Sequence, residues 1–486
     1  MNLLEAISDE KLFAGWFRDR RTWDAWSAFI AALFGYPLED NRLALYRTCT
    51  GRQTVPATPF KEAWLVIGRR GGKSFMLALL AVFLACFNNY APFLAPGEYA
   101  TILIIAADRR QARIILGYIG GLLRGVPMLA RMVSTETKES FELSNRVRIE
   151  IATASFRSVR GFAIAACLCD ELAFWRSDDS ALPDFEVLRA IRPAMLTIPT
   201  SVLLCASSPY ARRGALYEAF VKHFGKDDAP ALVWRAPTLL MNPTVPKDEI
   251  DKEYELDPAS AAAEYGAEFR TDVEAFVSRE AVMACIEPGV RERPSERQWQ
   301  YVAFVDPSGG SSDSMTCAIA HKEGKTVRLD LVREVKPPFS PETVVEEFSD
   351  ILRRYRCIRV TGDRYGGEWC REQFRKRNII YDLAEKPKSD IYRDFLPLVN
   401  SGAVDLLDDA KLINQIVGLE RRTRAGGRDV IDHGPGGHDD LVNSAAGAVV
   451  LAVTKSLQRQ PSDIRMEGGI GWNPITYTYK PFHGGN

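Results

Sequence analysis

The feature that most constrains the fold is the stretch Trp64–Ser74, in which an apolar run breaks into a glycine-rich loop. A second apolar segment, Phe75–Phe87, follows directly, and this order predicts a strand, a loop and a helix. The backbone N–H groups of such a loop and the N-terminus of the helix can surround phosphate groups. Lys73 is placed to reach the β- and γ-phosphates, and Ser74 to hold Mg²⁺. We interpret the stretch as a phosphate-binding loop, with a structural glycine-rich turn as the alternative.

The loop departs from the usual pattern in one respect. The pattern has a glycine five positions before Gly72, but that position is Ile67, and Gly68 leaves the loop one residue short. The expected nucleotide-binding residues of the loop are Gly68, Arg69, Arg70, Gly71, Gly72, Lys73 and Ser74. Gln53, in the loop-like segment before it, is a candidate for reading the adenine edge, and a solvated side chain is the alternative.

Composition restricts the class of protein. At 486 residues the chain is expected to hold two or three domains, and its 46% apolar and 26% charged residues are typical of a globular protein. The net charge of −1 means that any nucleic-acid site must be a local basic patch. Nine cysteines without a CxxC pair and five histidines predict reduced thiols and no zinc site. The start of the chain has no signal-peptide pattern and the longest apolar run is too short for a bilayer, so we expect a soluble intracellular protein.

Strands alternate with helices along the chain, which predicts an α/β protein. Residues 1–275 are expected to form a phosphate-loop ATPase domain of the ASCE type, with a mostly parallel sheet and a helical lid segment at 1–60. Residues 276–298, rich in Pro, Gly and charged residues, predict a linker. A second α/β domain is expected at 299–455, followed by a tail at 456–486.

Two acidic residues directly follow the apolar segment 163–169. Because ligands bind at the carboxyl ends of parallel strands, Asp170 is the candidate Mg²⁺ ligand and Glu171 is the candidate for polarising the attacking water. Surface charge at a strand exit is the alternative. Ser207 follows the next apolar segment and is a candidate γ-phosphate sensor, unless it only ends the strand.

An arginine is expected to neutralise charge on the γ-phosphate, an effect on the order of 10³–10⁵ in rate. Arg160, in the basic loop before the Asp170 strand, is the favoured candidate. Arg69 and Arg70 compete for the same role.

A second set of carboxylates lies in the C-terminal half. Asp306 and Asp363 end two predicted strands, and Asp439 and Asp440 open a late helix. This layout predicts a ribonuclease-H-like nuclease, in which two metal ions about 3.5–4 Å apart act on a phosphodiester. The candidate metal ligands are Asp306, Asp363 and either Asp439 or Asp440; helix capping is the alternative for the last two.

A basic hairpin is expected at 418–431, between the second and third acidic positions. Its arginines would suit the phosphate backbone of a nucleic acid. A solvated edge hairpin is the alternative.

The motifs together resemble the large terminase subunit of tailed bacteriophages. The matching segments, in the order of that family, are 68–74, 167–171, 205–208, 264–269, 305–307, 362–363 and 438–440. The short phosphate loop is similar to the deviant loops of that family.

The resemblance implies ATP-driven translocation of double-stranded viral DNA into a procapsid and metal-dependent endonucleolytic cutting of concatemeric DNA. It implies ATP and Mg²⁺ as cofactors, with Mn²⁺ able to substitute in the nuclease site. The implied partners are double-stranded DNA, a small terminase subunit and the portal of the procapsid, with assembly as a ring that we expect to be a pentamer. The implied location is the host cell cytoplasm, outside the mature virion.

Two alternatives remain open at this point. One is another ATP-dependent DNA helicase or repair nuclease, and the other is a nucleotide-dependent DNA-binding switch with an inactive nuclease fold.

Overall fold

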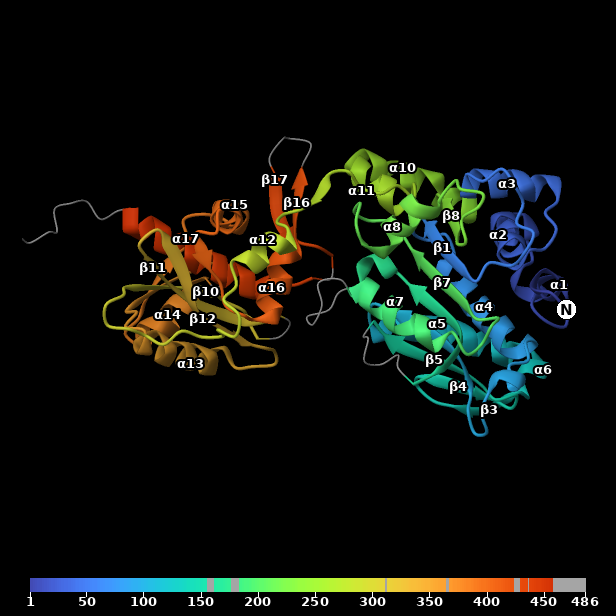
Figure 1. Ribbon diagram of the computed structural model, residues 1–486, viewed down its shortest axis with the longest axis horizontal. Helices are drawn as coiled ribbons and strands as arrows, with labels where there is room; N and C mark the ends of the chain where they lie inside the picture. The colour runs from blue at the N-terminus through green and yellow to red at the C-terminus, as the bar shows by residue number, and fades with distance from the viewer. Residues whose placement is uncertain are drawn as a thin grey trace, which may run out of the picture.

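The computed structural model describes residues 1–154, 161–175, 183–310, 313–363, 367–423, 429–435 and 437–457. These residues form two bodies, each built around its own sheet (Figure 1). The N-terminal body runs from blue to green in the figure and the C-terminal body from yellow to red. Within the described residues, no helix combines the length and apolar character needed to cross a membrane.

The N-terminal body holds an eight-stranded sheet of order β3-β4-β5-β2-β6-β7-β1-β8. Its strands are β1 (Glu62–Ile67), β2 (Ala100–Ala106), β3 (Val133–Glu136), β4 (Ser140–Leu143), β5 (Val147–Thr153), β6 (Ala163–Asp170), β7 (Val202–Ser207) and β8 (Leu232–Ala236). From β5 to β8 every neighbouring pair is parallel, whereas β3 and β4 are antiparallel additions at the edge. The carboxyl ends of β1, β6 and β7 therefore meet at one edge of the sheet, and the predicted mostly parallel α/β fold is confirmed.

Helices cover both faces of this sheet, which explains why its strands are continuously apolar. The helices are α1 (Leu3–Ser8), α2 (Asp24–Phe34), α3 (Asp40–Thr50), α4 (Lys73–Phe87), α5 (Arg109–Gly125), α6 (Pro127–Ala130), α7 (Pro183–Ala194), α8 (Gly214–His223), α9 (Thr238–Met241), α10 (Lys247–Leu256) and α11 (Pro258–Glu264). Leu65 and Ile67 of β1 share a core with α2, α4 and α5, whereas Trp64 and Val66 share the opposite core with α7 and α8. Successive side chains of one strand thus enter different cores.

The C-terminal body holds a six-stranded sheet of order β14-β13-β10-β11-β12-β15. Its strands are β10 (Tyr301–Asp306), β11 (Met315–Glu323), β12 (Thr326–Val335), β13 (Arg359–Gly362), β14 (Ile380–Leu383) and β15 (Val404–Asp405). Strands β10, β11 and β12 form an antiparallel meander, and β13 and β14 continue the sheet parallel to β10. A meander extended by parallel strands on the side of its first strand is the predicted ribonuclease-H-like arrangement, and the fold class is confirmed.

Helices enclose this second sheet as well. They are α12 (Arg279–Ala284), α13 (Pro341–Arg354), α14 (Gly367–Lys376), α15 (Lys388–Asn400), α16 (Ala410–Val417) and α17 (Asp440–Leu457). Helix α17 crosses β10, β11 and β12 on one face, and α13 and α14 pack on the other (Figure 1). The first turn of α17 therefore lies close to the end of β10.

A small third sheet, of order β17-β16-β9, lies between the two bodies (Figure 1). It consists of β9 (Val273–Ala275), β16 (Leu419–Thr423) and β17 (Asp429–His433). Strand β9 precedes residue 276, yet it pairs with the C-terminal hairpin, and Phe276 and Val277 enter the core of the second body. The boundaries at 275, 298 and 455 stay predictions, and residues 458–486 of the expected tail lie outside the described residues.

Candidate functional site

The loop between β1 and α4 surrounds the ammonium group of Lys73. Lys73 is buried, and its Nζ donates hydrogen bonds to the carbonyls of Ile67 (3.1 Å) and Gly68 (3.4 Å) and to Ser208 Oγ (3.0 Å). The same Nζ lies 3.4 Å from Glu171 Oε1. A buried cation is thus held at the carboxyl edge of the first sheet, where an anionic ligand would meet it.

Three backbone carbonyls of this loop accept hydrogen bonds from side chains of other elements. The carbonyls of Arg69, Arg70 and Gly71 accept hydrogen bonds from Thr238 Oγ1 (2.7 Å), Asn242 Nδ2 (2.9 Å) and Trp26 Nε1 (2.9 Å), in that order. These bonds hold the carbonyls toward neighbouring elements. The first N–H groups of α4 have no partner within the helix, so they can bind a phosphate. The three donors lie far from the loop in sequence, and no local pattern indicated them.

Two glycines permit this geometry. Gly72 caps α4 with a φ of +89°, in the left-handed region that favours glycine. A Cβ on Gly68 would stand 2.6 Å from the carbonyl oxygen of Tyr265, so only glycine fits there. Gly68 therefore begins the loop in place of the expected earlier glycine.

Asp170 and Ser74 form the candidate magnesium site. Asp170 ends the central strand β6, and its Oδ2 accepts a hydrogen bond from Ser74 Oγ at 3.4 Å. Its Oδ1 is buried and has no hydrogen-bond partner within the residues described. Burial, followed by the neighbouring Glu171 carboxylate, raises the pKa of Asp170 to about 7. A hydroxyl beside a carboxylate with an unused buried oxygen fits a divalent cation.

Glu171 occupies a strained position between the strand ends. Its φ of +49° is uncommon for a residue with a side chain. Its Oε2 accepts hydrogen bonds from Ser207 Oγ and from the backbone N–H of Ser208, both at 3.1 Å. The predicted sensor Ser207 thus touches the predicted base Glu171. Ser208, which the sequence analysis did not assign, contacts Lys73 as well.

Of the remaining nucleotide candidates, Arg69 lines one pocket with Glu171 and Ser208. The Arg69 side chain is exposed and pairs with Glu264 at 3.4 Å, and Arg70 is exposed. Arg160 lies outside the described residues.

The structure does not bring Gln53 to the phosphate loop. The backbone N–H of Gln53 donates to Asp227 at 2.8 Å, and the neighbouring Arg52 donates to the Ala231 carbonyl, just before β8 begins. This is the amino end of the parallel strands, whereas the phosphate loop follows their carboxyl end. The position of Gln53 therefore does not support a role in binding adenine.

The second candidate centre forms where β10, β13 and α17 meet. Val305 and Gly362 are paired residues of parallel strands, so Asp306 and Asp363 follow side by side. Asn443, one turn into α17, donates to Asp306 Oδ2 at 2.8 Å. Thr316, which is paired with Asp306 across the sheet, donates to the Asp440 carbonyl at 2.6 Å. These two bonds fix the start of α17 beside the strand ends.

Several carboxylates crowd this second centre. Burial raises the pKa of Asp306, the hydrogen bond from Asn443 opposes this, and the carboxylates of Asp440, Asp363 and Asp439 add to it, with a net value of about 7. Burial, followed by Asp439, also raises the pKa of Asp440. Several carboxylates that share a buried site are expected to be charged together only when a cation joins them. The donor set therefore fits a divalent metal.

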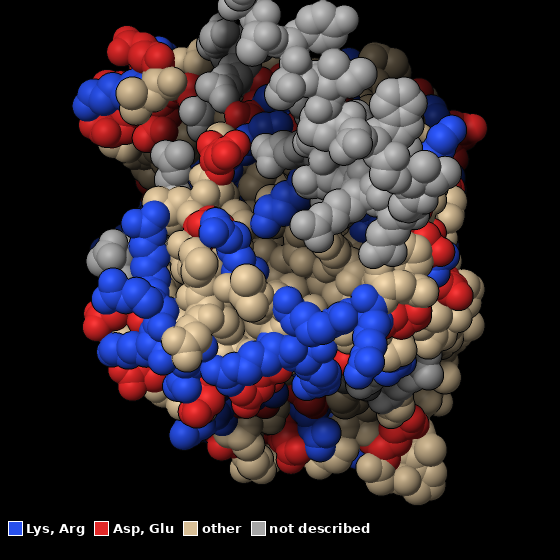
Figure 2. Space-filling model, turned by 90° about the vertical axis from the view of Figure 1, so that its left-hand side faces the viewer, with Lys and Arg blue, Asp and Glu red and all other residues tan. Residues whose placement is uncertain are grey.

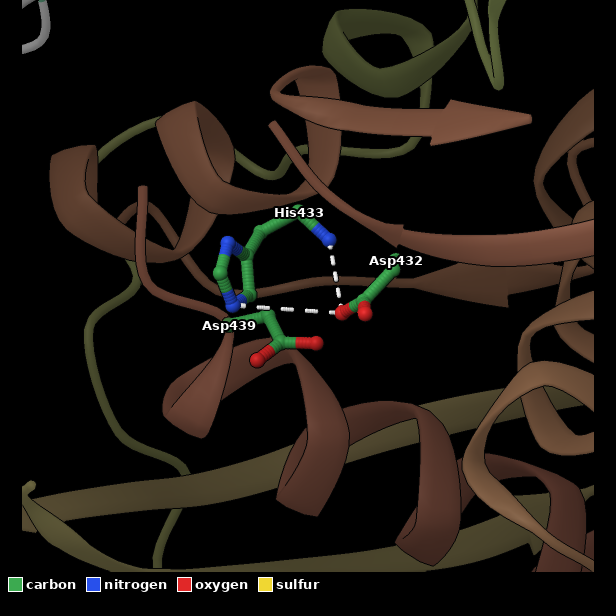
Figure 3. A group of neighbouring side chains, drawn as sticks. All are labelled: Asp432, His433 and Asp439. Carbon is green, nitrogen blue, oxygen red and sulfur yellow. Dashed lines mark hydrogen bonds and ion pairs between the residues drawn. The ribbon is translucent and has the colours of Figure 1, made fainter. Parts of the chain in front are cut away.

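Asp439 and Asp440 have different surroundings. Asp439 is buried in a cluster with Asp432 and His433, whose possible ligand atoms lie within 4.8 Å of one another (Figure 3). Lys388 Nζ already lies 2.8 Å from both Asp432 Oδ1 and Asp439 Oδ2, and Tyr392 donates to Asp439 at 2.9 Å. A metal in this cluster would have to displace an ammonium group. Asp439 is thus occupied by Lys388, which leaves Asp440 as the better candidate ligand beside Asp306.

A family model matches residues 64–228 of the chain, and it is described as the N-terminal part of the terminase large subunit, T4-like-virus type. No curated protein matches. The matched segment contains the phosphate loop, Asp170, Glu171 and Ser207, which are the residues that converge at the edge of the first sheet.

Solved structures of large terminases are among those similar to the chain. The large terminase of bacteriophage HK97 is 17% identical, with 81% of this chain and 91% of that chain covered and a TM-score of 0.36. The large terminase of a thermophilic bacteriophage is 9% identical, with 86% and 99% covered and a TM-score of 0.38. The large terminase nuclease of the thermophilic phage G20c is 17% identical, with 35% and 94% covered and a TM-score of 0.31.

The identification rests on the family model together with the motifs and their geometry. The resemblance to the large terminase subunit that the motifs indicated is confirmed, and residues 64–228 match the model of its N-terminal part.

Proposed function

We propose that this chain is a packaging motor with a nuclease: it hydrolyses ATP to move double-stranded viral DNA into a procapsid, and it cuts concatemeric DNA with the help of metal ions. The observation that carries the proposal is the presence of two separate carboxylate centres in one chain. One lies with Lys73 at the edge of a parallel sheet, and the other lies at the strand ends of a ribonuclease-H-like sheet.

At the first centre, Lys73 would bind the β- and γ-phosphates and Glu171 would orient and deprotonate the attacking water. Ser74 and Asp170 would hold Mg²⁺, which neutralises phosphate charge when bound. The bonds that Ser207 and Ser208 make with Glu171 and Lys73 support a sensing role for both serines.

At the second centre, we propose Asp306, Asp363 and Asp440 as the metal ligands. Bound metal would supply an activated water and stabilise the leaving oxygen. Asp439, paired with Lys388 and Tyr392, would position the start of α17 rather than bind the ion.

DNA would need a basic surface, because the net charge of the chain is only −1. At the free end of the C-terminal body, Lys and Arg side chains gather around a hollow of uncharged surface (Figure 2). A pocket of about 510 Å³ in this body is lined by four basic residues, Arg359, Arg371, Lys386 and Lys455, and by two acidic ones, Asp382 and Glu385. These features support contacts with the phosphate backbone.

The resemblance extends the proposal to partners. We propose double-stranded DNA, a small terminase subunit and the portal of the procapsid as partners, assembly as a pentameric ring, and action in the host cell cytoplasm.

The test measures three activities of the full chain. We expect ATP hydrolysis with Mg²⁺, cleavage of supercoiled plasmid with Mn²⁺, and no strand separation of a fluorescently labelled duplex. ATP-dependent strand separation would favour a helicase or repair enzyme. ATP-dependent DNA binding with no cleavage in Mn²⁺ would favour a switch with an inactive nuclease fold.

A further inference from the structure

A pocket of about 470 Å³ lies between the two bodies. The N-terminal body lines it with residues of the first centre, and the C-terminal body lines it with residues of the hairpin that carries β16 and β17. Among the lining residues are Arg69, Glu171, Ser208, Glu264, Arg270, Arg422 and Pro435. We propose that Arg422 of the C-terminal body contacts the terminal phosphate of an ATP molecule bound at the phosphate loop. This inference rests on the proposed ATPase function.

The pocket lies on the terminal-phosphate side of the first centre. Lys73 is expected to reach the β- and γ-phosphates, and its Nζ contacts Glu171 and Ser208. Those two residues also line the pocket. A nucleotide whose phosphates meet Lys73 would therefore direct its terminal phosphate toward the wall that contains Arg422.

Arg422 is held firmly at this wall. It lies in β16, between β9 and β17, and is paired with Val273 and Val430. Its Nη2 donates to Glu420 Oε2 at 3.2 Å and to the His433 carbonyl at 2.8 Å. Its Nε is buried and has no hydrogen-bond partner in the part of the chain that the structure describes. The guanidinium is thus fixed through one nitrogen and retains donors for an anion.

Glu420 joins Arg422 to the N-terminal body. Its carboxylate is fully buried and accepts a hydrogen bond from the Tyr210 hydroxyl at 2.6 Å, as well as one from Arg213. Tyr210 follows Ser208 by two residues, so one short segment contacts both Lys73 and the hairpin. The position of Arg422 therefore depends on the contact between the two bodies.

The other arginines of the pocket are engaged differently. Arg270 makes two bonds with Asp272, at 3.0 and 2.6 Å, which occupy its guanidinium. Arg69 belongs to the phosphate loop itself and pairs with Glu264 at 3.4 Å. Of the arginines that line the described pocket, Arg422 is the one that the C-terminal body supplies. Its charge would complete the site only while the bodies are in contact.

The test compares nucleotide binding and hydrolysis in the full chain. We expect Arg422→Ala to lower kcat for ATP at least about 10-fold, because an arginine on the terminal phosphate stabilises the charge that develops there. Binding of the non-hydrolysable β,γ-imido analogue of ATP should weaken about 10-fold, while binding of ADP should change less than about 2-fold. Loss of selectivity for the triphosphate is the result that a merely structural residue would not produce.

Two further variants test whether the effect belongs to Arg422 and whether it depends on the charge of that residue. Arg421→Ala removes the neighbouring arginine, which pairs with Asp429 at 3.5 Å and does not line the pocket. Without DNA, this variant should keep the wild-type ratio of analogue to ADP affinity. Arg422→Gln keeps donors for Glu420 and His433 but lacks the charge, so it should retain the fold and still lose triphosphate selectivity.

The inference is overturned if Arg422→Gln keeps both the wild-type kcat and the wild-type ratio of analogue to ADP affinity. If the wild-type chain hydrolyses no ATP, the ATPase proposal fails, and the ratio of the two affinities still decides the role of Arg422. The two failures are therefore distinguishable.

Discussion

The two carboxylate centres differ in how their charge is balanced. At the first, the protein supplies its own cation, because the buried Lys73 ammonium lies 3.4 Å from Glu171. At the second, the partner of Asp306 is the neutral amide of Asn443, and the nearby ammonium of Lys388 is bound to Asp432 and Asp439. The first centre therefore has its own cation among the described residues, whereas the proposed metal ion would be the cation of the second.

The largest expected effect comes from removing the proposed base of the first centre while keeping its phosphate-binding groups. Glu171→Gln should lower the rate of ATP hydrolysis by on the order of 10³-fold, because the amide cannot take a proton from water. Nucleotide binding should persist, since Lys73 and the loop are intact. Steady-state hydrolysis and equilibrium binding measure the two quantities, and equal losses in both would show that Glu171 serves binding rather than catalysis.

The next largest effect distinguishes the role of Asp440 in cleavage from the role of Asp439 in stability. Asp440→Asn should lower plasmid cleavage by about 100-fold or more with little change in thermal stability, because it removes a proposed ligand. Asp439→Asn should keep measurable cleavage but lower the free energy of unfolding by about 2 kcal/mol, because Lys388 loses one of its buried partners. The reverse pattern would assign the metal to Asp439.

A smaller effect concerns pH in the metal-free chain. The pKa of Asp306 is raised to about 7 by burial and by carboxylates on β13 and α17. Between about pH 4 and pH 7 the folded chain keeps a proton that the unfolded chain has lost, so the free energy of unfolding falls as pH rises. Unfolding in a chelator should show this decline, and Asp306→Asn should flatten it. Affinity for Mn²⁺ should rise over the same interval, since the metal competes with the proton. Equal pH slopes for wild type and variant would contradict the assignment.

The smallest effect concerns the support of the phosphate loop. Trp26→Phe removes the hydrogen bond to the Gly71 carbonyl, which is 2.9 Å long, while keeping most of the packing. A bond of this kind contributes about 1 kcal/mol, so ATP affinity should fall about 5-fold. The affinity of the second centre for Mn²⁺ is the matched control and should not change. An unchanged ATP affinity would show that the loop holds its shape without Trp26.

The strand-end carboxylates could be predicted because they follow from local pattern. An apolar run followed by Asp170, Asp306 or Asp363 places a carboxylate at the edge of a sheet, whatever the rest of the fold does. The phosphate loop was predictable for the same reason, and the structure explains its short form through the contact of Gly68 with Tyr265.

Contacts between distant segments could not be predicted in this way. Trp26 reaches Gly71 across 45 positions and Tyr210 reaches Glu420 across 210, and neither pair has a local signal. The difference between Asp439 and Asp440 depends on Lys388, which enters from another helix. The chain direction of the sheet, which the local sequence does not reveal, puts Gln53 near the amino end of β8, away from the phosphate loop.

If one chain contains two independent catalytic centres, a crossed pair of variants should separate their activities. ATP hydrolysis with Mg²⁺ and plasmid cleavage with Mn²⁺ are measured for wild type, Lys73→Ala and Asp363→Ala. We predict that Lys73→Ala abolishes hydrolysis and leaves cleavage, and that Asp363→Ala abolishes cleavage and leaves hydrolysis. If one variant abolishes both activities, or if neither activity responds to its own variant, the account of two centres is contradicted.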